Sequence, residues 1–396
     1  MKIFLLIEIL LRISKQEFCK KNMWRDLIMN HKITKINVHL VSTKMPDNIA
    51  DATRKVESVG YLIVRLTTED GLEGIGITYH EVGGQAIKEV IMRDAAPLVI
   101  GRDPFETEVV WQDMVQYLRG VGRKGLIFCA ISAIDIAMWD LKGKITGLPL
   151  YKLFGGNQTK IPAYCTGGWT SYSDEELVKE LKDIVAQGYK MVKFKVGVEG
   201  GQNIKRDLER VRKVREAIGP DIGIMLDANN VWDSTTSIRF ANKVKQYDIM
   251  FLEEPVGADD IPGLARFRRS TDMTLATGEQ EYTKFGARDL VMAEAADIIQ
   301  IDCARAGGYT EALKVAAIAQ AWNLKIAPHG MEHIHMHLIS AMPNGLFVER
   351  TLTFEEITAK AFIDAPMPKN GFIDIPDLPG IGLKLNMDYI KSHDEK

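Results

Sequence analysis

The stretch MVKFKVG at residues 191–197 carries two lysines, Lys193 and Lys195, in an otherwise apolar segment. Side chains alternate between the two faces of a strand, so both ammonium groups would point the same way, about 6 to 7 Å apart. An isolated pair of this kind usually lies on a solvated strand face. The residues that follow in the chain favour a reactive site instead.

Acids and a histidine recur after the lysine pair, each at or near the end of a short apolar stretch. They are Asp227, Glu253, Glu279, Asp302, His329 and Glu349. Taken singly, most such acids would be helix caps or surface residues. The intervals between them are nearly even, however, and in a parallel barrel the reacting groups sit where strands end and loops begin. The spacing therefore predicts that these side chains share one site.

Asp227, Glu253 and Glu279 would bring three negative charges to one point. Such a cluster needs a cation to stay ionised in a partly dry pocket, and all-oxygen ligation selects a hard ion, Mg²⁺ first. The residues alone leave open whether Glu254 replaces Glu253 as a ligand, although Glu253 fits the phase of the strand better.

The lysine pair can then act in proton transfer. Two neighbouring ammonium groups near a divalent cation disfavour each other's protonation, which predicts a lowered pKa and a base that works near neutrality. Lys195, nearer the strand end, is the candidate base. Lys193 is the candidate that holds a substrate carboxylate.

His329 lies in the segment APHG, and Asp302 ends the preceding strand. A carboxylate beside an imidazole fixes its tautomer and supports its charged form. The two residues are therefore expected to make a second acid/base unit opposite Lys195. The nearby His333, His335 and His337 do not form an HExxH pattern and are interpreted as non-ligating.

Strands that could position these residues alternate with helical stretches through the second half of the chain. They are predicted to begin near residues 161, 191, 222, 248, 274, 297, 324 and 346. Eight strands at a spacing of about 25 residues favour a parallel (β/α) barrel over an open sheet. No glycine-rich nucleotide fingerprint follows any of them, which disfavours a dinucleotide-binding fold.

Four segments are expected along the chain. Residues 1–30 form an N-terminal extension of unknown role, whose apolar run is interrupted by charges and is too short for a membrane span. Residues 31–155 read as an antiparallel sheet followed by helices, a small α+β domain. Residues 156–355 form the barrel, and residues 356–396 return to pack on the N-terminal domain.

The charge and cysteine composition of the chain excludes some kinds of binding partner and indicates a compartment. The 396 residues carry a net charge of −3 with no long run of either sign, which argues against a nucleic-acid or membrane surface. The four cysteines show no paired spacing, as is typical of reduced thiols in the cytoplasm.

The motifs KFK, LDAN, EEP, GEQ, QIDCARAGG and APHG, with AISAIDIAMWDLKGKITGLPLYKLFGG upstream, resemble the enolase superfamily, specifically its mandelate racemase subgroup. The resemblance covers roughly residues 32 to 390 and implies a modified TIM barrel, (β/α)7β, under an α+β capping domain. It implies one Mg²⁺ per subunit on Asp227, Glu253 and Glu279. Lids are implied at residues 45–58 and 78–85.

The resemblance also implies roles for the remaining site residues. Lys195 would be one base and the Asp302–His329 dyad the other. Lys193 and Glu349 would contact the carboxylate and the developing enediolate oxygen, with Asn229 beside the substrate. A cytoplasmic homo-oligomer, a dimer or an octamer, is implied as well.

The expected activity is dehydration of an acid sugar, an aldonate or aldarate of the galactarate or talarate kind, to a 2-keto-3-deoxy acid. A racemase, an epimerase or a cycloisomerase of a 2-hydroxy or sugar acid is the alternative, because the same bases serve these reactions. A dipeptide epimerase or a muconate-type lactonising enzyme is disfavoured by His329, and a non-catalytic binding protein by the complete set of site residues.

Overall fold

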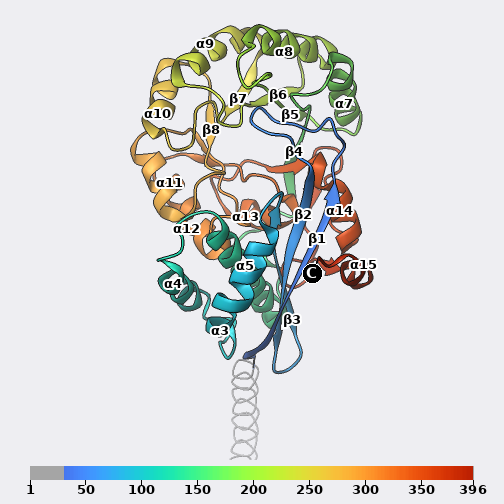
Figure 1. Ribbon diagram of the computed structural model, residues 1–396, viewed down its shortest axis with the longest axis vertical. Coiled ribbons are helices and arrows are strands. Elements are labelled where there is room, and N and C mark those ends of the chain that lie inside the picture. Colours follow the sequence, from blue (N-terminus) through green and yellow to red (C-terminus); the bar gives the residue numbers. More distant parts are fainter. Residues whose placement is uncertain (1–30, 396) are drawn as a thin grey trace, which may run out of the picture.

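The computed structural model describes residues 31–395, so the predicted extension at residues 1–30 lies outside the described part of the chain. A barrel occupies the upper part of the view in Figure 1, and a sheet with flanking helices lies against its lower side. Within residues 31–395 no helix is both long and apolar enough to cross a membrane.

The N-terminal sheet is antiparallel, in the order β1-β2-β3. Its strands are β1 (Ile33–Lys44), β2 (Ser58–Thr68) and β3 (Glu73–His80). The central strand, β2, is an almost uninterrupted apolar run that is buried along most of its length. The sheet therefore needs a cover on each face, and helices and the C-terminal segment supply it.

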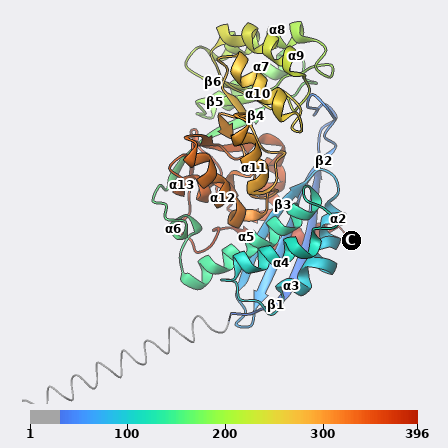
Figure 2. The same ribbon diagram turned by 90° about the vertical axis from the view of Figure 1, so that its left-hand side faces the viewer.

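Helices follow the sheet and cover one of its faces (Figure 2). They are α2 (Gly84–Glu89), η1 (Val90–Ala95), α3 (Ala96–Val99), α4 (Thr107–Leu118), α5 (Leu126–Thr146) and the short α6 (Leu150–Leu153). Helix α5 approaches β3 closely because Gly76 has no side chain. A Cβ there would lie 1.7 Å from the carbonyl oxygen of Ala133. Helix α5 ends at Gly147, which adopts the left-handed conformation of a C-cap.

The second part of the chain forms a parallel barrel, as predicted. Its strands are β4 (Lys160–Gly167), β5 (Met191–Lys195), β6 (Gly223–Asp227), β7 (Ile249–Glu253), β8 (Leu275–Thr277), β9 (Ile298–Ile299), β10 (Lys325–Ile326) and β11 (Val348–Thr351). The hydrogen-bonded order runs from β10 through β4 to β11. Hydrogen bonds between Ile326 and the chain at Asn344 and Leu346 join the two ends of this order.

A helix follows each of the first seven barrel strands in the described chain, which gives the predicted (β/α)7β arrangement. These helices are α7 (Asp174–Ala186), α8 (Ile204–Ile218), α9 (Ser234–Val244), α10 (Ile261–Ser270), α11 (Thr283–Met292), α12 (Gly308–Ala321) and α13 (Glu332–Ala341), with a 3-10 turn η2 (Lys245–Tyr247) after α9. Helix α7 begins in a capping box between Ser173 and Glu176. The segment with three histidines lies on α13.

The barrel interior is filled by one apolar side chain from each of seven strands or strand ends. These residues are Tyr164, Met225, Phe251, Ala276, Ile298, Ala327 and Phe347. Because side chains alternate along a strand, the residue two positions further on also faces the interior, one layer nearer the C-terminal ends. Asp227, Glu253, His329 and Glu349 each lie two residues after one of these apolar side chains.

The C-terminal segment runs back over both parts of the molecule. It contains η3 (Leu352–Phe354), α14 (Glu355–Ala361), β12 (Phe362–Ile363), β13 (Phe372–Asp374), β14 (Lys384–Leu385) and α15 (Met387–His393). Strand β13 pairs with β4 of the barrel, whereas Asp394 accepts a hydrogen bond from the backbone of Leu40 in β1. Figure 1 shows α14 and α15 beside β1.

Candidate active site

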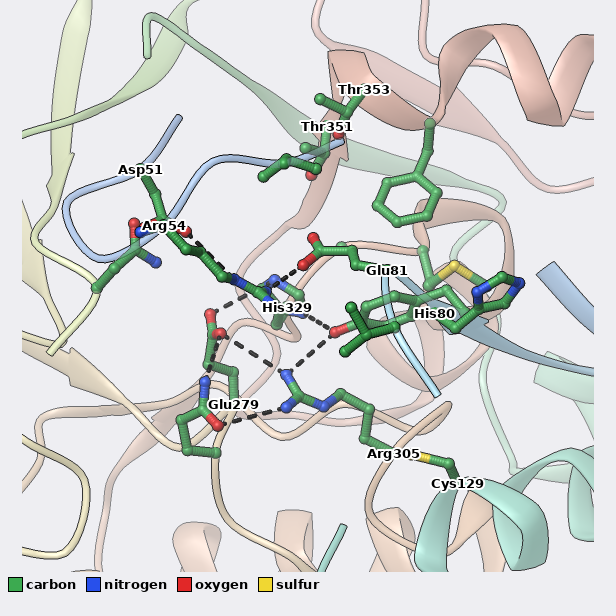
Figure 3. A pocket seen from close by; sticks show the side chains of 18 of the residues that line it. Asp51, Arg54, His80, Glu81, Cys129, Glu279, Arg305, His329, Thr351 and Thr353 are labelled. Carbon is green, nitrogen blue, oxygen red and sulfur yellow. Dashed lines mark hydrogen bonds and ion pairs between the residues drawn. The ribbon is translucent and has the colours of Figure 1, made fainter. Parts of the chain in front are cut away.

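A cavity of about 380 Å³ lies between the C-terminal ends of the barrel strands and the N-terminal domain. Its lid comes from the loop between β1 and β2, with Asp51 and Arg54, and from the end of β3, with His80 and Glu81. These segments belong to the two stretches predicted as lids. Figure 3 shows Arg54 and Glu81 joined across the cavity, with His329, Glu279 and Arg305 nearby.

The lysine pair lies on β5 with both ammonium groups turned inward, as the alternation predicts. Lys193 Nζ lies 2.7 Å from both carboxylate oxygens of Glu253 and 2.8 Å from Glu349. Lys195 Nζ lies 2.5 Å from Asp227. Lys195 is therefore paired with a carboxylate of the neighbouring strand β6, and Lys193 with carboxylates of β7 and β11, each two strands away.

The lowered pKa predicted for the lysines depends on a divalent cation beside them, and the protein side chains alone shift the pKa of both lysines the other way. Burial, and for Lys195 the neighbouring Lys193, would lower the pKa of each lysine. Asp227 and Glu253 outweigh these effects and raise the pKa of both ammonium groups above its usual value. The carboxylates of β6 and β7 carry more weight than the like charge on the same strand, because they are in direct contact with the ammonium groups.

The carboxylates at the strand ends suit a hard cation. Burial, together with the neighbouring Glu279, Asp227 and Glu253, raises the pKa of Glu254 well above its usual value. One carboxylate oxygen of Glu254, one of Glu279 and the amide oxygen of Asn229 are buried and accept no hydrogen bond. An excess of acids with unpartnered oxygens fits Mg²⁺. Among the described residues no three side chains are already arranged around a single ion position.

His329 and Asp302 form the predicted pair. His329 Nδ1 lies 3.1 Å from Asp302, and its Nε2 lies 3.4 Å from Glu279. Burial alone would lower the pKa of His329, but Glu279, Asp302 and Glu349 raise it to about 9. The imidazole is thus held between two carboxylates and is favoured in its charged form.

The N-terminal domain is bonded to the loop that carries Asp302. Trp111 donates to the carbonyl oxygen of Gly307 at 2.9 Å, and Asp135 accepts from the backbone of Thr310 at 3.0 Å. Gly308 is required here, because a Cβ would lie 2.2 Å from Asp135 and its φ of 80° is left-handed. This contact fixes the lid domain relative to the dyad.

His335 links the loops on which the dyad lies. Its Nδ1 is 2.7 Å from the carbonyl oxygen of Gly330, and its Nε2 accepts the backbone N–H of Cys303 at 2.9 Å. These partners assign the Nδ1–H tautomer. The imidazole therefore joins the residue after Asp302 to the residue after His329.

The predicted site residues divide into two groups. Lys195, Asn229, Glu279 and His329 line the cavity. Lys193, Asp227, Glu253, Asp302 and Glu349 are almost fully buried behind its wall, where Asp227 contacts Lys195 and Asp302 contacts His329. All nine lie at one end of the barrel.

Several residues of the site were not predicted from the sequence. Gln300 donates to Glu253 at 2.6 Å, and it lies two residues after the interior Ile298, so the alternation could have identified it. Tyr79 lies 3.3 Å from His329, and Arg305 donates to Tyr79 at 3.1 Å. Arg305 lies only three residues after Asp302, but its partners Tyr79 and Tyr282 lie on other elements of the chain, so its own segment does not reveal its position.

The barrel, its α+β cap and the cavity between them define an enolase-superfamily enzyme fold. The chain belongs to the mandelate racemase / muconate lactonizing enzyme family, as the sequence resemblance predicted. Residues 32–155 match the N-terminal domain of that family, and residues 176–389 match the group described as enolase C-terminal domain-like.

Two characterised relatives show the range of chemistry. The 3,6-anhydro-alpha-L-galactonate cycloisomerase of Streptomyces coelicolor is 33% identical, over 90% of this chain and 98% of its own. The L-talarate/galactarate dehydratase of Salmonella typhimurium is 33% identical over 84% and 82% of the two chains.

Solved structures of relatives contain magnesium. A racemase from Streptomyces coelicolor with bound magnesium superposes with a TM-score of 0.87, at 31% identity and 92% and 100% coverage of the two chains. The Salmonella dehydratase with magnesium and L-lyxarohydroxamate gives a TM-score of 0.86 at 29% identity, covering 93% of this chain and 94% of its own.

Proposed function

We propose that the protein is a Mg²⁺-dependent acid-sugar dehydratase that removes the α-proton of an aldonate or aldarate and expels a β-hydroxyl. The observation that carries this proposal is the pair of proton-transfer groups on one cavity, Lys195 and the Asp302-supported His329, beside a cluster of buried carboxylates. A carboxylate substrate can be bound there with its α-carbon between the two groups.

Asp227, Glu253 and Glu279 are the residues that would hold the ion, on the strength of their hard oxygen donors. Magnesium, when bound, supplies positive charge that offsets the second negative charge developing on the substrate carboxylate. Lys193 adds an ammonium group at the same end, and Glu349 keeps it in place through their 2.8 Å ion pair. Asn229, on the cavity wall, is placed to contact the substrate.

The proposed reaction proceeds in two proton movements. Lys195 or His329, in its unprotonated form, takes the α-proton, which leaves an enediolate. Protonated His329 then gives a proton to the β-hydroxyl, the carbon–oxygen bond breaks and water leaves, so that the resulting enol becomes a 2-keto-3-deoxy acid. The pKa of about 9 for His329 favours the charged form that donates this proton.

Racemisation, epimerisation or cycloisomerisation of a 2-hydroxy or sugar acid is the second candidate. It is favoured by the presence of bases from two different strands, because a group on the opposite face of the enediolate can return the proton. A substrate without a β-hydroxyl can react only in this way.

A screen of the Mg²⁺-loaded protein against mono- and di-acid sugars tests both candidates. We expect 2-keto acid from one or a few substrates and loss of product in Lys195→Ala and His329→Ala. Exchange of the α-proton in D₂O without a keto product would select the isomerase candidate. Neither product nor exchange with any acid would refute both.

We further propose that the protein works as a cytoplasmic homo-oligomer, a dimer or an octamer. The three cysteines in the described part of the chain, Cys129, Cys165 and Cys303, are free and buried, which is consistent with a reducing compartment. Sedimentation velocity at micromolar concentration measures the oligomeric state directly, and a monomer would contradict this assignment.

A further inference from the structure

The lid end of the cavity carries more negative than positive charge. Arg54 contributes the cation there, and it forms ion pairs with Glu81 and, at 3.8 Å, with Asp51. Asp51 also accepts hydrogen bonds from the backbone N–H groups of Thr53 and Arg54. Two carboxylates therefore share one guanidinium group.

The other cation of the lid loop, Lys55, does not contribute positive charge to the cavity. Lys55 pairs with Asp47 at 2.8 Å, and neither residue lines the cavity. Arg305 does line it, but its guanidinium donates to the hydroxyl groups of Tyr79 and Tyr282 and to Gln280, and lies 3.7 Å from Glu279. Among the lining residues in the described part of the chain, each arginine is already matched by acids.

The barrel end of the cavity differs from the lid end in its charged groups. Lys195 and His329 lie there, and the buried carboxylates behind them suit a cation. A substrate with one carboxylate would bind it at this end. A second carboxylate at the far end of the substrate would meet Glu81 and Asp51, and like charges brought together in this way disfavour binding. Hydroxyl groups, in contrast, can donate to both acids.

We propose that the substrate is an acid sugar with a single carboxylate and a neutral, hydroxylated far end, an aldonate and not an aldarate, and that Glu81 excludes the second carboxylate. This inference rests on the proposed function, of which it specifies the substrate class. Figure 3 shows the groups involved, with Glu81 and Arg54 on the lid side of His329.

The test compares aldonate and aldarate pairs of matched stereochemistry, such as gluconate with glucarate and galactonate with galactarate. For the Mg²⁺-loaded full-length protein we expect kcat/KM for α-proton exchange, and the affinity measured by calorimetry, to favour the aldonate of the reactive pair by about tenfold or more. In Glu81→Gln the aldonate-to-aldarate ratio should fall by a similar factor, because Arg54 gains an unpaired donor.

Asp47→Asn is the matched control, since it removes an exposed carboxylate from the lid loop that carries Arg54, and Asp47 does not line the cavity. Its ratio should equal that of the unaltered protein. Equal use or binding of aldarates by the unaltered protein, or an unchanged ratio in Glu81→Gln, would overturn the inference. If no acid sugar exchanges its α-proton, the proposed function fails, but the affinity ratio still decides the charge preference.

Discussion

Tyr79 of the lid accepts a hydrogen bond from Arg305 of the barrel at 3.1 Å, and its hydroxyl lies 3.3 Å from Nδ1 of His329. One phenol thus connects the N-terminal domain to both a lining cation and the candidate acid/base. Burial raises the pKa of Tyr79 well above its usual value, although Arg305 opposes this, so the phenol stays protonated.

Tyr79→Phe removes this connection while keeping the ring. We expect substrate affinity and kcat both to fall, with a loss of about 1 kcal/mol per hydrogen bond. Steady-state kinetics with the best substrate of the screen measure the effect. A variant with unchanged kcat/KM would mean that the Tyr79 hydroxyl has no part in aligning His329.

Removal of the metal should lower stability as well as activity. An ion that binds only the folded state stabilises it by RT ln(1 + [L]/Kd), about 2.7 kcal/mol when the free ion is at about 100 times its Kd. Thermal unfolding with and without a chelator measures this gain. The gain in stability from the ion should be small in Glu279→Gln. It should be the same as in the unaltered protein in Asp289→Asn, which changes an exposed acid on α11. An equal gain in the unaltered protein and in both variants would mean that Glu279 does not bind the ion.

His335→Leu should reduce kcat more than it changes KM. The substitution leaves the carbonyl oxygen of Gly330 and the N–H of Cys303 without their partner, which costs about 1 to 3 kcal/mol for each buried group and loosens the spacing of Asp302 and His329. His335→Gln, which retains a donor and an acceptor, should recover part of the rate.

His337→Leu is the control for His335, because it removes another buried imidazole from α13, one bonded to Ile381. It should lower stability with little effect on kcat. If both leucine variants lose kcat equally, His335 contributes to the stability of the helix and not to the alignment of the dyad.

Stability should depend on pH through Asp135 at the contact between α5 and α12. Burial raises the pKa of Asp135 to about 7, although Thr310 donates to it. The folded state therefore holds this proton more tightly than the unfolded state, and the cost of ionising Asp135 grows as pH rises from about 4 to 7. Relative to the unaltered protein, Asp135→Asn should gain about 2 to 4 kcal/mol across this window and no more above it.

Urea unfolding of both proteins at pH 5 and pH 8 measures that difference. A constant offset at the two pH values would show that Asp135 does not change its protonation on folding. The comparison between the two proteins cancels the contributions of all other titrating groups.

Period-two alternation explains why Asp227, Glu253, His329 and Glu349 face the barrel interior, because the residues two positions before them are its apolar filling. It does not account for Glu279, which lies three positions after the interior Ala276. The charge state of the lysines was not predictable in this way. It depends on contacts between strands, such as Lys195 with Asp227. The link between Tyr79 and His329, 250 residues apart, likewise has no local signal.

The contact between Asp394 and the backbone of Leu40 has a consequence for synthesis of the chain. The two residues are 354 positions apart, so β1 leaves the ribosome long before the segment that binds along it. In the order β1-β2-β3 it is an edge strand, with backbone groups open to pairing with another chain until α15 arrives. A nascent chain that stalls during synthesis of the barrel would therefore leave the edge strand β1 open to aggregation. Of the steps in synthesis, this is the one at which protection of β1 by a chaperone would be needed for longest.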